Sequence, residues 1–279
     1  MIGYYVHHHG GGHLARARCI AARSSEPITV LSSLARPAEA TEFADWVRLD
    51  RDDLEPGLAA DAGGALHFAP QGVTGYTDRM HSVAEWVRHT TPTLVVVDVS
   101  VEVSALVRLL GVPIVVMAGP GERLDAPHRL SYQLADRIIA PWPEAVYAPA
   151  YLRPFAAKVD YVGAMSRFDY RPVGPSAGTN RVLALFGRGG SSVSQSDVDA
   201  ASRATPQWQW LSFGAADMRW CPDVWSELLE ADVVVCHGGQ NVLAEVAAAR
   251  RPALLVPQSR PFGEQDATAT ALHLSLIHI

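Results

Sequence analysis

A glycine turn followed by a helix carries polar side chains at a spacing suited to a nucleotide. The turn 237–239 leads into a predicted helix, Gln240–Arg250, on which Asn241 and Glu245 lie four residues apart and share a face. The start of a helix binds anions through its open N–H groups. Glu245 lies about 9 Å along the axis from Gly239 at 1.5 Å per residue. A diphosphate at the turn would therefore place a ribose diol near this carboxylate, which can accept both hydroxyl hydrogen bonds.

The alternative for these two residues is structural. Asn241 can act as a cap at the helix start, and Glu245 can be a solvated residue of the helix surface. Further along, Glu264 and Gln265 follow the next predicted strand and offer polar groups for sugar hydroxyls. The turn itself, with His237, Gly238 and Gly239, and the first helical residue, Gln240, complete the candidate site for a phosphorylated ligand.

Two more glycine-rich turns follow predicted strands. The turn 9–13 follows the first strand, and the turn 187–192, with Gly189, Gly190 and Ser191, follows the first strand of the second half. Glycine lets backbone N–H groups approach an anion, although it also simply permits a tight turn. No turn reads G-x-x-x-x-G-K-[ST], which excludes a P-loop NTPase. None reads G-x-G-x-x-G with an acidic residue about 20 positions later, which disfavours a nicotinamide enzyme.

His13 is the candidate general base. It stands at a predicted helix start, where the helix dipole disfavours the imidazolium form and leaves the ring able to accept a proton from a hydroxyl group. The alternative is a capping or polar loop histidine. The preceding histidines, His7, His8 and His9, are expected to be loop or strand-end residues, because adjacent residues cannot all converge on one metal ion.

Other polar residues are weaker candidates for the binding of a second substrate. Asp98 ends a buried strand, and Asp125 lies with His128 in a loop; both are expected to face the acceptor, near Gly11 and Gly12. The sequence Asp50-Arg51-Asp52 has the D-x-D form of some metal-dependent transferases, but it is expected to be a solvated loop. No metal and no cofactor are expected.

The predicted elements alternate between strands and helices, the pattern of parallel α/β sheets. In the first half the predicted strands are Ile2–Val6, Ile28–Ser33, Trp46–Leu49, Leu94–Asp98, Ile114–Met117 and Arg137–Ala140, an open sheet of six. The predicted helices there are Leu14–Arg23, Tyr76–His89 and Glu102–Leu110. The run 93–98 is continuously apolar, as expected of a strand buried on both faces.

A second series of elements follows a segment rich in proline and glycine. Its predicted strands are Val159–Val162, Arg181–Phe186, Gln207–Phe213, Asp232–Cys236 and Ala253–Val256, and its helices are Gln195–Ala204, Asp223–Glu230, Gln240–Arg250 and Glu264–Leu272. Two doubly wound domains, 1–165 and 166–279, are therefore predicted. The second domain is expected to be incomplete, because residues 274–279 resemble a translated adapter sequence rather than a natural terminus.

Composition narrows the function classes. The 279 residues are 48% hydrophobic and carry a net charge of −6, which disfavours nucleic acid as the main partner. Three scattered cysteines exclude a disulfide framework and favour a reducing cytoplasm. No apolar run approaches the roughly 18 residues of a membrane-spanning helix.

The segment from the second-half turn onward resembles the donor-binding signature of GT-B glycosyltransferases. Both the plant and macrolide type (H-x-G-x-N/G-x-x-x-E … P … P … D/E-Q) and family 28, which holds peptidoglycan N-acetylglucosaminyltransferases and galactolipid synthases, are similar. The matching residues are His237, Gly239, Asn241, Glu245, Pro252, Pro257, Glu264 and Gln265. Residues 10–13 similarly resemble the family's N-terminal G-x-G-G-H turn.

This resemblance implies two Rossmann-like domains facing across a cleft, with a nucleotide-diphosphate sugar in the C-terminal one and an acceptor in the other. Glu245 would bind the ribose, and the helix start near Gly238 would face the diphosphate. Glu264 and Gln265 would contact the transferred sugar, with residues 188–192 near the nucleotide. The C-terminal segment that crosses back to the first domain in this fold is expected to be missing from the chain.

The expected reaction is sugar transfer to an acceptor hydroxyl, inverting and metal-independent. UDP or TDP donors are favoured by the resemblance, and the acceptor is a lipid-linked or small molecule. The enzyme is expected in the cytoplasm, with peripheral binding at the inner membrane face as a further option. Two alternatives stay open: a nucleotide-sugar epimerase or hydrolase on the same fold, and a non-catalytic protein that binds nucleotide sugars.

Overall fold

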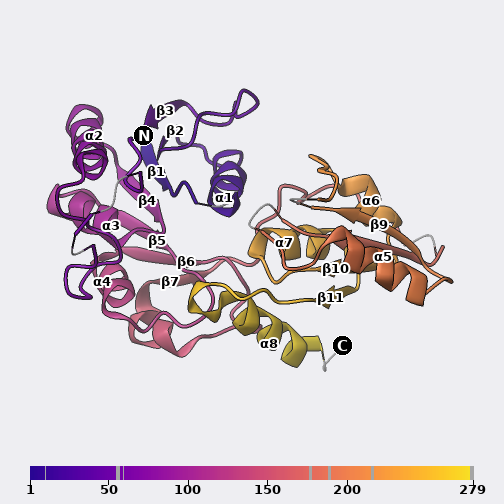
Figure 1. The fold of residues 1–279 in the computed structure, drawn as a ribbon. Coiled ribbons are helices and arrows are strands. Elements are labelled where there is room, and N and C mark those ends of the chain that lie inside the picture. Colours follow the sequence, from indigo (N-terminus) through magenta and orange to yellow (C-terminus); the bar gives the residue numbers. More distant parts are fainter. Residues whose placement is uncertain are drawn as a thin grey trace. The chain divides into compact units, whose positions relative to one another are not determined.

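The chain forms two compact α/β units. The computed structural model describes residues 1–9, 11–54, 57–58, 60–175, 178–187, 190–214 and 217–276. Residues 1–9 and 13–163 form unit 1, and the residues from Ala164 onward form the body of unit 2 (Figure 1). Each unit is built on one parallel sheet, as expected from the sequence. Among the described residues, no helix combines the length and the apolar character that crossing a membrane requires.

Seven parallel strands form the sheet of unit 1, in the order β3-β2-β1-β4-β5-β6-β7. Their bounds are β1 Ile2–Val6, β2 Ile28–Ser32, β3 Asp45–Arg48, β4 Leu94–Asp98, β5 Ile114–Met117, β6 Arg137–Ala140 and β7 Val159–Tyr161. The expectation of six strands is wrong by one. The short strand β7 belongs to this sheet and not to the second series, because it pairs in parallel with β6, with Val159 opposite Ile138.

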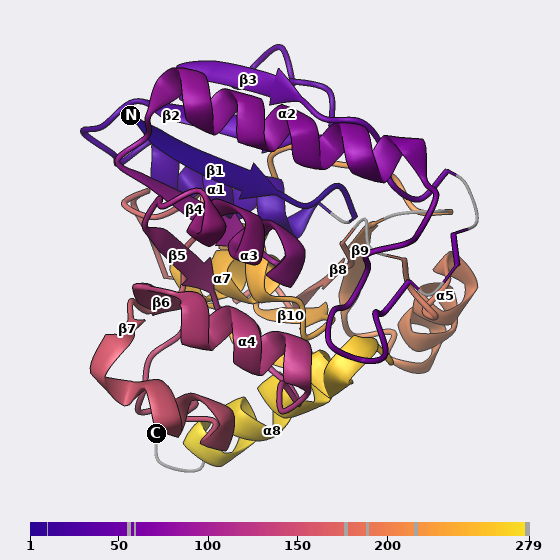
Figure 2. The same ribbon diagram turned by 90° about the vertical axis from the view of Figure 1, so that its left-hand side faces the viewer.

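Helices cover both faces of this sheet. Their bounds are α1 Gly12–Ala21, α2 Thr74–Thr90, α3 Val101–Leu109 and α4 Ala126–Leu134, with a 3₁₀ segment, η1, at Ala150–Lys158. Helices α2, α3 and α4 lie on one face and α1 lies on the other (Figures 1 and 2). Helix α4 and the segment η1 are absent from the sequence-based prediction.

The core of unit 1 lies between the sheet and α2–α4. Its central side chains are at most 2% exposed, among them Tyr5, Val83, Val97, Val107 and Ile114. Each such side chain contributes on the order of 1.5–3 kcal/mol through burial. The apolar run of β4 is buried, as predicted, and it carries Asp98 at its end into the interior.

Gly3 sets how closely α2 approaches β1. A Cβ atom built at Gly3 would lie 2.6 Å from Cη2 of Trp86, which no real contact permits. A glycine is therefore needed at this position, because the indole ring of Trp86 in α2 packs directly on the strand.

Unit 2 contains four parallel strands in the order β11-β10-β8-β9. The strands are β8 Arg181–Leu185, β9 Gln209–Phe213, β10 Val233–Cys236 and β11 Ala253–Leu255. The helices are α5 Gln195–Ala204, α6 Trp225–Glu230, α7 Gln240–Ala248 and α8 Glu264–Leu276, with a 3₁₀ turn, η2, at Pro261–Gly263. The elements predicted from Arg181 onward are all present. Helix α8 is longer than predicted and continues into the segment that the sequence-based interpretation set aside.

Along β8, successive side chains point to opposite faces of the sheet and so join two different apolar clusters. Leu183 and Leu185 pack with α6 and α7, whereas Ala184 and Phe186 pack with Val198 of α5. A sheet covered on both faces exposes only the ends of its strands, so ligand groups have to be carried by the turns that follow them.

Candidate active site

Each sheet contains a point where the strand order reverses direction. In unit 1 this point lies between β1 and β4, and in unit 2 it lies between β8 and β10. In open α/β sheets, the turns leaving two such neighbouring strands diverge and leave a crevice at the carboxyl ends, where ligands bind. Most of the predicted site residues follow these four strands, whereas Asp125 comes after β5 and Glu264 and Gln265 come after β11.

The turns after β8 and β10 are the first part of the candidate donor site. Gly190 has a φ of 87°, a left-handed conformation that glycine adopts readily. Gly239 stands directly before α7 and makes no side-chain cap. The start of α7 thus presents main-chain N–H groups and the positive end of the helix dipole, the arrangement that binds phosphate. Gly189 was also predicted here, and it lies outside the described residues.

His237 ties the two turns together. Its Nδ1 lies 2.8 Å from the carbonyl oxygen of Val256, which can only accept, so Nδ1 donates. Its Nε2 lies 2.9 Å from Oγ of Ser191. Burial lowers the pKa of His237, so the neutral ring is favoured. The ring therefore positions Ser191 of the β8 turn against the end of β10.

Gln265, which was expected to contact the sugar, holds the β10 turn in place. Its Oε1 accepts from the backbone N–H of Gly238 at 3.1 Å and of Gln258 at 2.9 Å, and its side chain is buried. A Cβ atom at Gly238 would lie 3.0 Å from Cβ and from the backbone oxygen of Gln265, so a glycine is needed for this approach. Because its N–H is given to Gln265, Gly238 serves mainly to let α8 close on the turn.

The loop after β11 contributes residues that sequence reasoning missed. Gln258 accepts from the N–H of Ser192 at 2.7 Å, and Arg260 donates to the carbonyl oxygen of Gly190 at 2.8 Å. Phe262 has a φ of 62°, a left-handed conformation that costs free energy outside glycine and is often found at functional sites. The predicted residue Glu264 follows this strained turn as the first residue of α8.

Glu245 lies in α7 beside an arginine that the sequence did not indicate. Its Oε1 accepts from Nε of Arg167 at 2.8 Å, and the carboxylate side chain is 13% exposed. Burial raises the pKa of Glu245, and the positive charge of Arg167 opposes that rise. Asn241 and Gln240 occupy the first turn of the same helix, as predicted. The carboxylate is thus held in one orientation by an ion pair.

In unit 1, His13 and Asp98 form a hydrogen-bonded pair. Nδ1 of His13, near the start of α1, donates to Oδ1 of Asp98 at 2.9 Å. Asp98 is fully buried and also accepts from Tyr4 at 3.3 Å, with Arg16 3.6 Å away. Burial favours the neutral acid, but Arg16 and His13 outweigh it and hold the pKa of Asp98 below its usual value. A bound carboxylate at Nδ1 leaves Nε2 as the proton acceptor of the ring.

The other acceptor-side residues have different surroundings from those expected. Asp98 orients His13. Asp125 caps α4 by accepting from the N–H of His128 at 2.9 Å, and it also accepts from the His128 ring at 2.6 Å. Gly11 is exposed and Gly12 begins α1.

The expectation of a solvated loop at residues 50–52 is wrong for Asp52. Its side chain is 11% exposed and pairs with the buried Arg79, with Oδ2 lying 3.2 Å from Nε. Arg79 also donates to the hydroxyl group of Tyr5 at 2.8 Å. The D-x-D pattern thus provides a buried counter-ion rather than two metal ligands.

Acidification should destabilise the protein through His128. Burial and Arg123 lower the pKa of His128 to about 4, whereas an unfolded histidine titrates near 6.5. Between these pH values the unfolded state binds more protons, so the free energy of unfolding falls as the pH falls. We expect His128→Gln to reduce the loss between pH 7 and pH 4.5 by about 1–3 kcal/mol in urea titrations. An equal loss in the variant would contradict this assignment.

Comparisons of the folded chain with solved structures define its class. It is similar to a UDP-glucosyltransferase from Polygonum tinctorium, with a TM-score of 0.69 and 15% identity over 99% of this chain and 83% of that one. MurG from Acinetobacter baumannii gives a TM-score of 0.59 and 14% identity over 98% and 83%. The spinosyn rhamnosyltransferase SpnG complexed with thymidine diphosphate gives 0.63 and 15% over 99% and 85%. The fold is that of the GT-B glycosyltransferases.

The C-terminal part of the chain is similar in sequence to a known family of domains. Residues 206–277 match the model of the glycosyltransferase family 28 C-terminal domain. A Sorangium cellulosum protein, UDP-N-acetylglucosamine–N-acetylmuramyl-(pentapeptide) pyrophosphoryl-undecaprenol N-acetylglucosamine transferase, is 30% identical over 180 residues. That match spans 56% of this chain and 43% of the relative, so this chain covers less than half of the relative's length.

Proposed function

We propose that this protein is a glycosyltransferase that moves a sugar from a nucleoside-diphosphate donor to an acceptor hydroxyl group. The observation that carries the proposal is the switch point of unit 2. There, His237 connects the turn after β8 with the turn after β10. The turn after β10 leads into the start of α7, and Glu245 lies further along that helix. The segment 206–277, which contains β10 and α7, matches the family 28 C-terminal domain.

The donor is bound by unit 2 in this proposal. The α7 start and the loop with Gly190 and Ser191 hold the diphosphate, because main-chain N–H groups and the helix dipole stabilise anions. Glu245 accepts the ribose hydroxyl groups. Glu264 contacts the transferred sugar, and Gln265 supports the turn from behind while its amide nitrogen contributes to sugar binding. His237 and the neighbouring Asn241 and Gln240 complete the phosphate side.

His13 acts as the general base. The Nδ1–H group of the ring donates a hydrogen bond to Asp98, which leaves Nε2 to take up a proton. Nε2 removes the proton from the hydroxyl group of the second substrate while that oxygen forms its bond to the anomeric carbon. The bond from the anomeric carbon to the diphosphate breaks in the same displacement, and the configuration inverts. The negative charge that develops on the leaving diphosphate is stabilised by the amides of the turns, without a metal ion.

The substrates are proposed by class. The relative's name includes a UDP sugar, and the SpnG structure contains thymidine diphosphate, so UDP and TDP donors come first. Two classes of acceptor are proposed for this chain. The first is a lipid-linked acceptor, which a cytoplasmic protein would use at the inner face of the membrane. The second is a small molecule.

Incubation of the purified chain with UDP- and TDP-sugars tests the proposal. With a panel of lipid-linked and small-molecule acceptors, mass spectrometry should detect a glycosylated acceptor and the free nucleoside diphosphate. The same donors without an acceptor are the control. Rapid formation of an epimer or of free sugar in that control would favour an epimerase or a hydrolase. Nucleotide binding without any turnover would favour a non-catalytic protein.

A further inference from the structure

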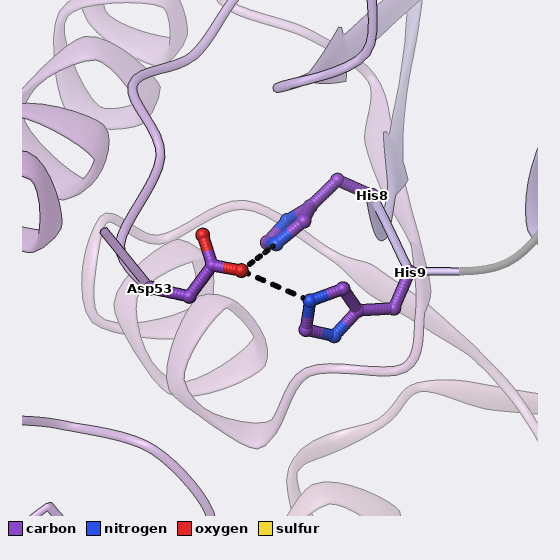
Figure 3. A group of neighbouring side chains, drawn as sticks. All are labelled: His8, His9 and Asp53. Atoms are coloured by element: carbon purple, nitrogen blue, oxygen red, sulfur yellow. Dashed lines mark hydrogen bonds and ion pairs between the residues drawn. The ribbon is translucent and has the colours of Figure 1, made fainter.

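A second cluster of chemically active side chains lies at the end of β1, apart from the His13–Asp98 pair. Nε2 of His8 lies 3.4 Å from Oδ2 of Asp53, and Nε2 of His9 lies 3.1 Å from the same oxygen. Figure 3 shows both rings directed at this carboxylate. The three ligand atoms lie within 4.8 Å of one another. The sequence predicted loop or strand-end histidines here, and two of them, His8 and His9, lie together with an aspartate from the loop after β3.

The local backbone explains how neighbouring histidines meet. The N–H of His9 donates to Nδ1 of His7 at 3.1 Å, and this bond closes a bend after β1. In an extended strand, successive side chains point to opposite faces, but in this bend the rings of His8 and His9 lie 4.2 Å apart at their centroids. The rings of His7 and His8 are stacked at 4.8 Å, which fixes the orientation of His8.

His8 is the residue that points to a ligand. Its side chain is 4% exposed, and among the described residues none makes a hydrogen bond with its Nε2. A buried polar atom without a hydrogen bond costs free energy, and such atoms are rare in folded proteins. The nearby Oδ2 of Asp53, 3.4 Å away, is within ion-pair distance of this nitrogen. A cation placed between the three atoms would satisfy all of them.

We propose that His8, His9 and Asp53 bind a divalent transition-metal ion of the Zn²⁺ class. A set of two imidazoles and one carboxylate suits ions of this class, whereas Mg²⁺ and Ca²⁺ prefer oxygen ligands. In a tetrahedral site with bonds of about 2.0–2.1 Å, ligand atoms are about 3.3 Å apart. The separations of 3.4 and 3.1 Å in the protein are close to this value.

Two arginines adjust the strength of the site. Nε of Arg51 donates to Oδ1 of Asp53 at 2.8 Å and so orients the carboxylate, while its Nη2 shares Oδ2 with the ion. Nη2 of Arg79 lies 3.5 Å from Nδ1 of His8, a long contact that coordination through Nε2 would end, because Nδ1 must then carry the proton. Both effects weaken binding, so we expect a dissociation constant of about 1–100 µM.

The ion would lie on the wall of a cavity. The three ligand residues line it together with Tyr76, Arg79 and Glu102, and its volume is about 240 Å³. Three protein ligands leave at least one coordination position for a water molecule or a substrate atom. The other acidic and histidine cluster, His67, Asp125 and His128, is less suited, because Asp125 also caps α4 by accepting from the backbone N–H of His128.

Titration of the metal-free chain with Zn²⁺, without a polyhistidine tag, tests the proposal. Isothermal titration calorimetry should show one equivalent bound in the micromolar range. His9→Ala removes an exposed ligand without disturbing the core, and Asp53→Asn keeps the side-chain shape; each should weaken binding at least tenfold. His81→Ala, an exposed histidine of α2, and His67→Ala, from the other cluster, should bind as the unmodified chain does.

X-ray absorption of the Zn²⁺ complex provides a second readout. It should show nitrogen and oxygen ligands at about 2.0–2.1 Å and no sulfur ligand at about 2.3 Å. A sulfur shell would place the ion at a cysteine and overturn the proposal. No binding by the unmodified chain, unchanged binding by His9→Ala and Asp53→Asn, or a loss confined to His67→Ala would also overturn it.

Discussion

His13→Ala is expected to lower the rate of sugar transfer by roughly 10²–10⁴-fold, the usual contribution of a positioned general base. Its affinity for the nucleotide should stay nearly unchanged, because the nucleotide-binding residues of the proposal belong to unit 2. The physical reason is the hydrogen bond from Nδ1 to the buried Asp98, which directs the free lone pair of Nε2 to a substrate. Steady-state rates and calorimetric titration with UDP measure the two effects separately.

Two further variants test this result: Asp98→Asn removes the partner of His13, and His81→Ala is a control. The asparagine keeps the shape of the side chain but removes the charge that favours the proton on Nδ1, so we expect an intermediate loss of rate. Arg16 then loses its charged partner, so thermal unfolding of this variant has to be followed as well. His81 is an exposed histidine of α2, and its removal should leave the rate as it is. Transfer by His13→Ala at the unmodified rate would exclude His13 as the base.

The strands of the sheets could be predicted because their sequences are simple. The strands β4 and β5 are short β-branched runs buried on both faces, and their predicted bounds are the observed ones. The edge strand β7 has three half-buried residues and no apolar run, so only its pairing with β6 reveals which sheet it joins. Helix α4 begins with Ala126-Pro127 behind its cap Asp125, a sequence that also fits a loop.

The candidate site could be predicted only where its residues lie close together in the sequence. The turn 237–239 and Glu245 lie on one turn and its helix, so their spacing follows from helix geometry. Asp98 meets His13 across 85 residues because β4 is the neighbour of β1 in the sheet, and strand order is not encoded in any local pattern. Arg167, Gln258 and Arg260 lie in polar loops, where the sequence gives no periodic signal.

Glu245→Ala is expected to weaken nucleotide binding roughly ten- to hundredfold, about 1.4–2.8 kcal/mol. A charged acceptor that binds two ribose hydroxyl groups contributes an amount of this order. The side chain is 13% exposed and is held by Arg167, so little conformational entropy is lost when the ribose binds. Calorimetric titration with UDP measures the change, with Glu230→Ala, an exposed carboxylate of α6, as the control.

Removal of one ribose hydroxyl group from the ligand separates a ribose contact from a structural effect. If Glu245 binds the diol, 2′-deoxy-UDP should bind the unmodified chain more weakly than UDP does. That difference should shrink in Glu245→Ala, because the two changes remove the same hydrogen bond and are not additive. If Glu245 only orders Arg167 and α7, both nucleotides should lose affinity equally in the variant. An additive result would therefore reject the ribose assignment even if Glu245→Ala binds UDP poorly.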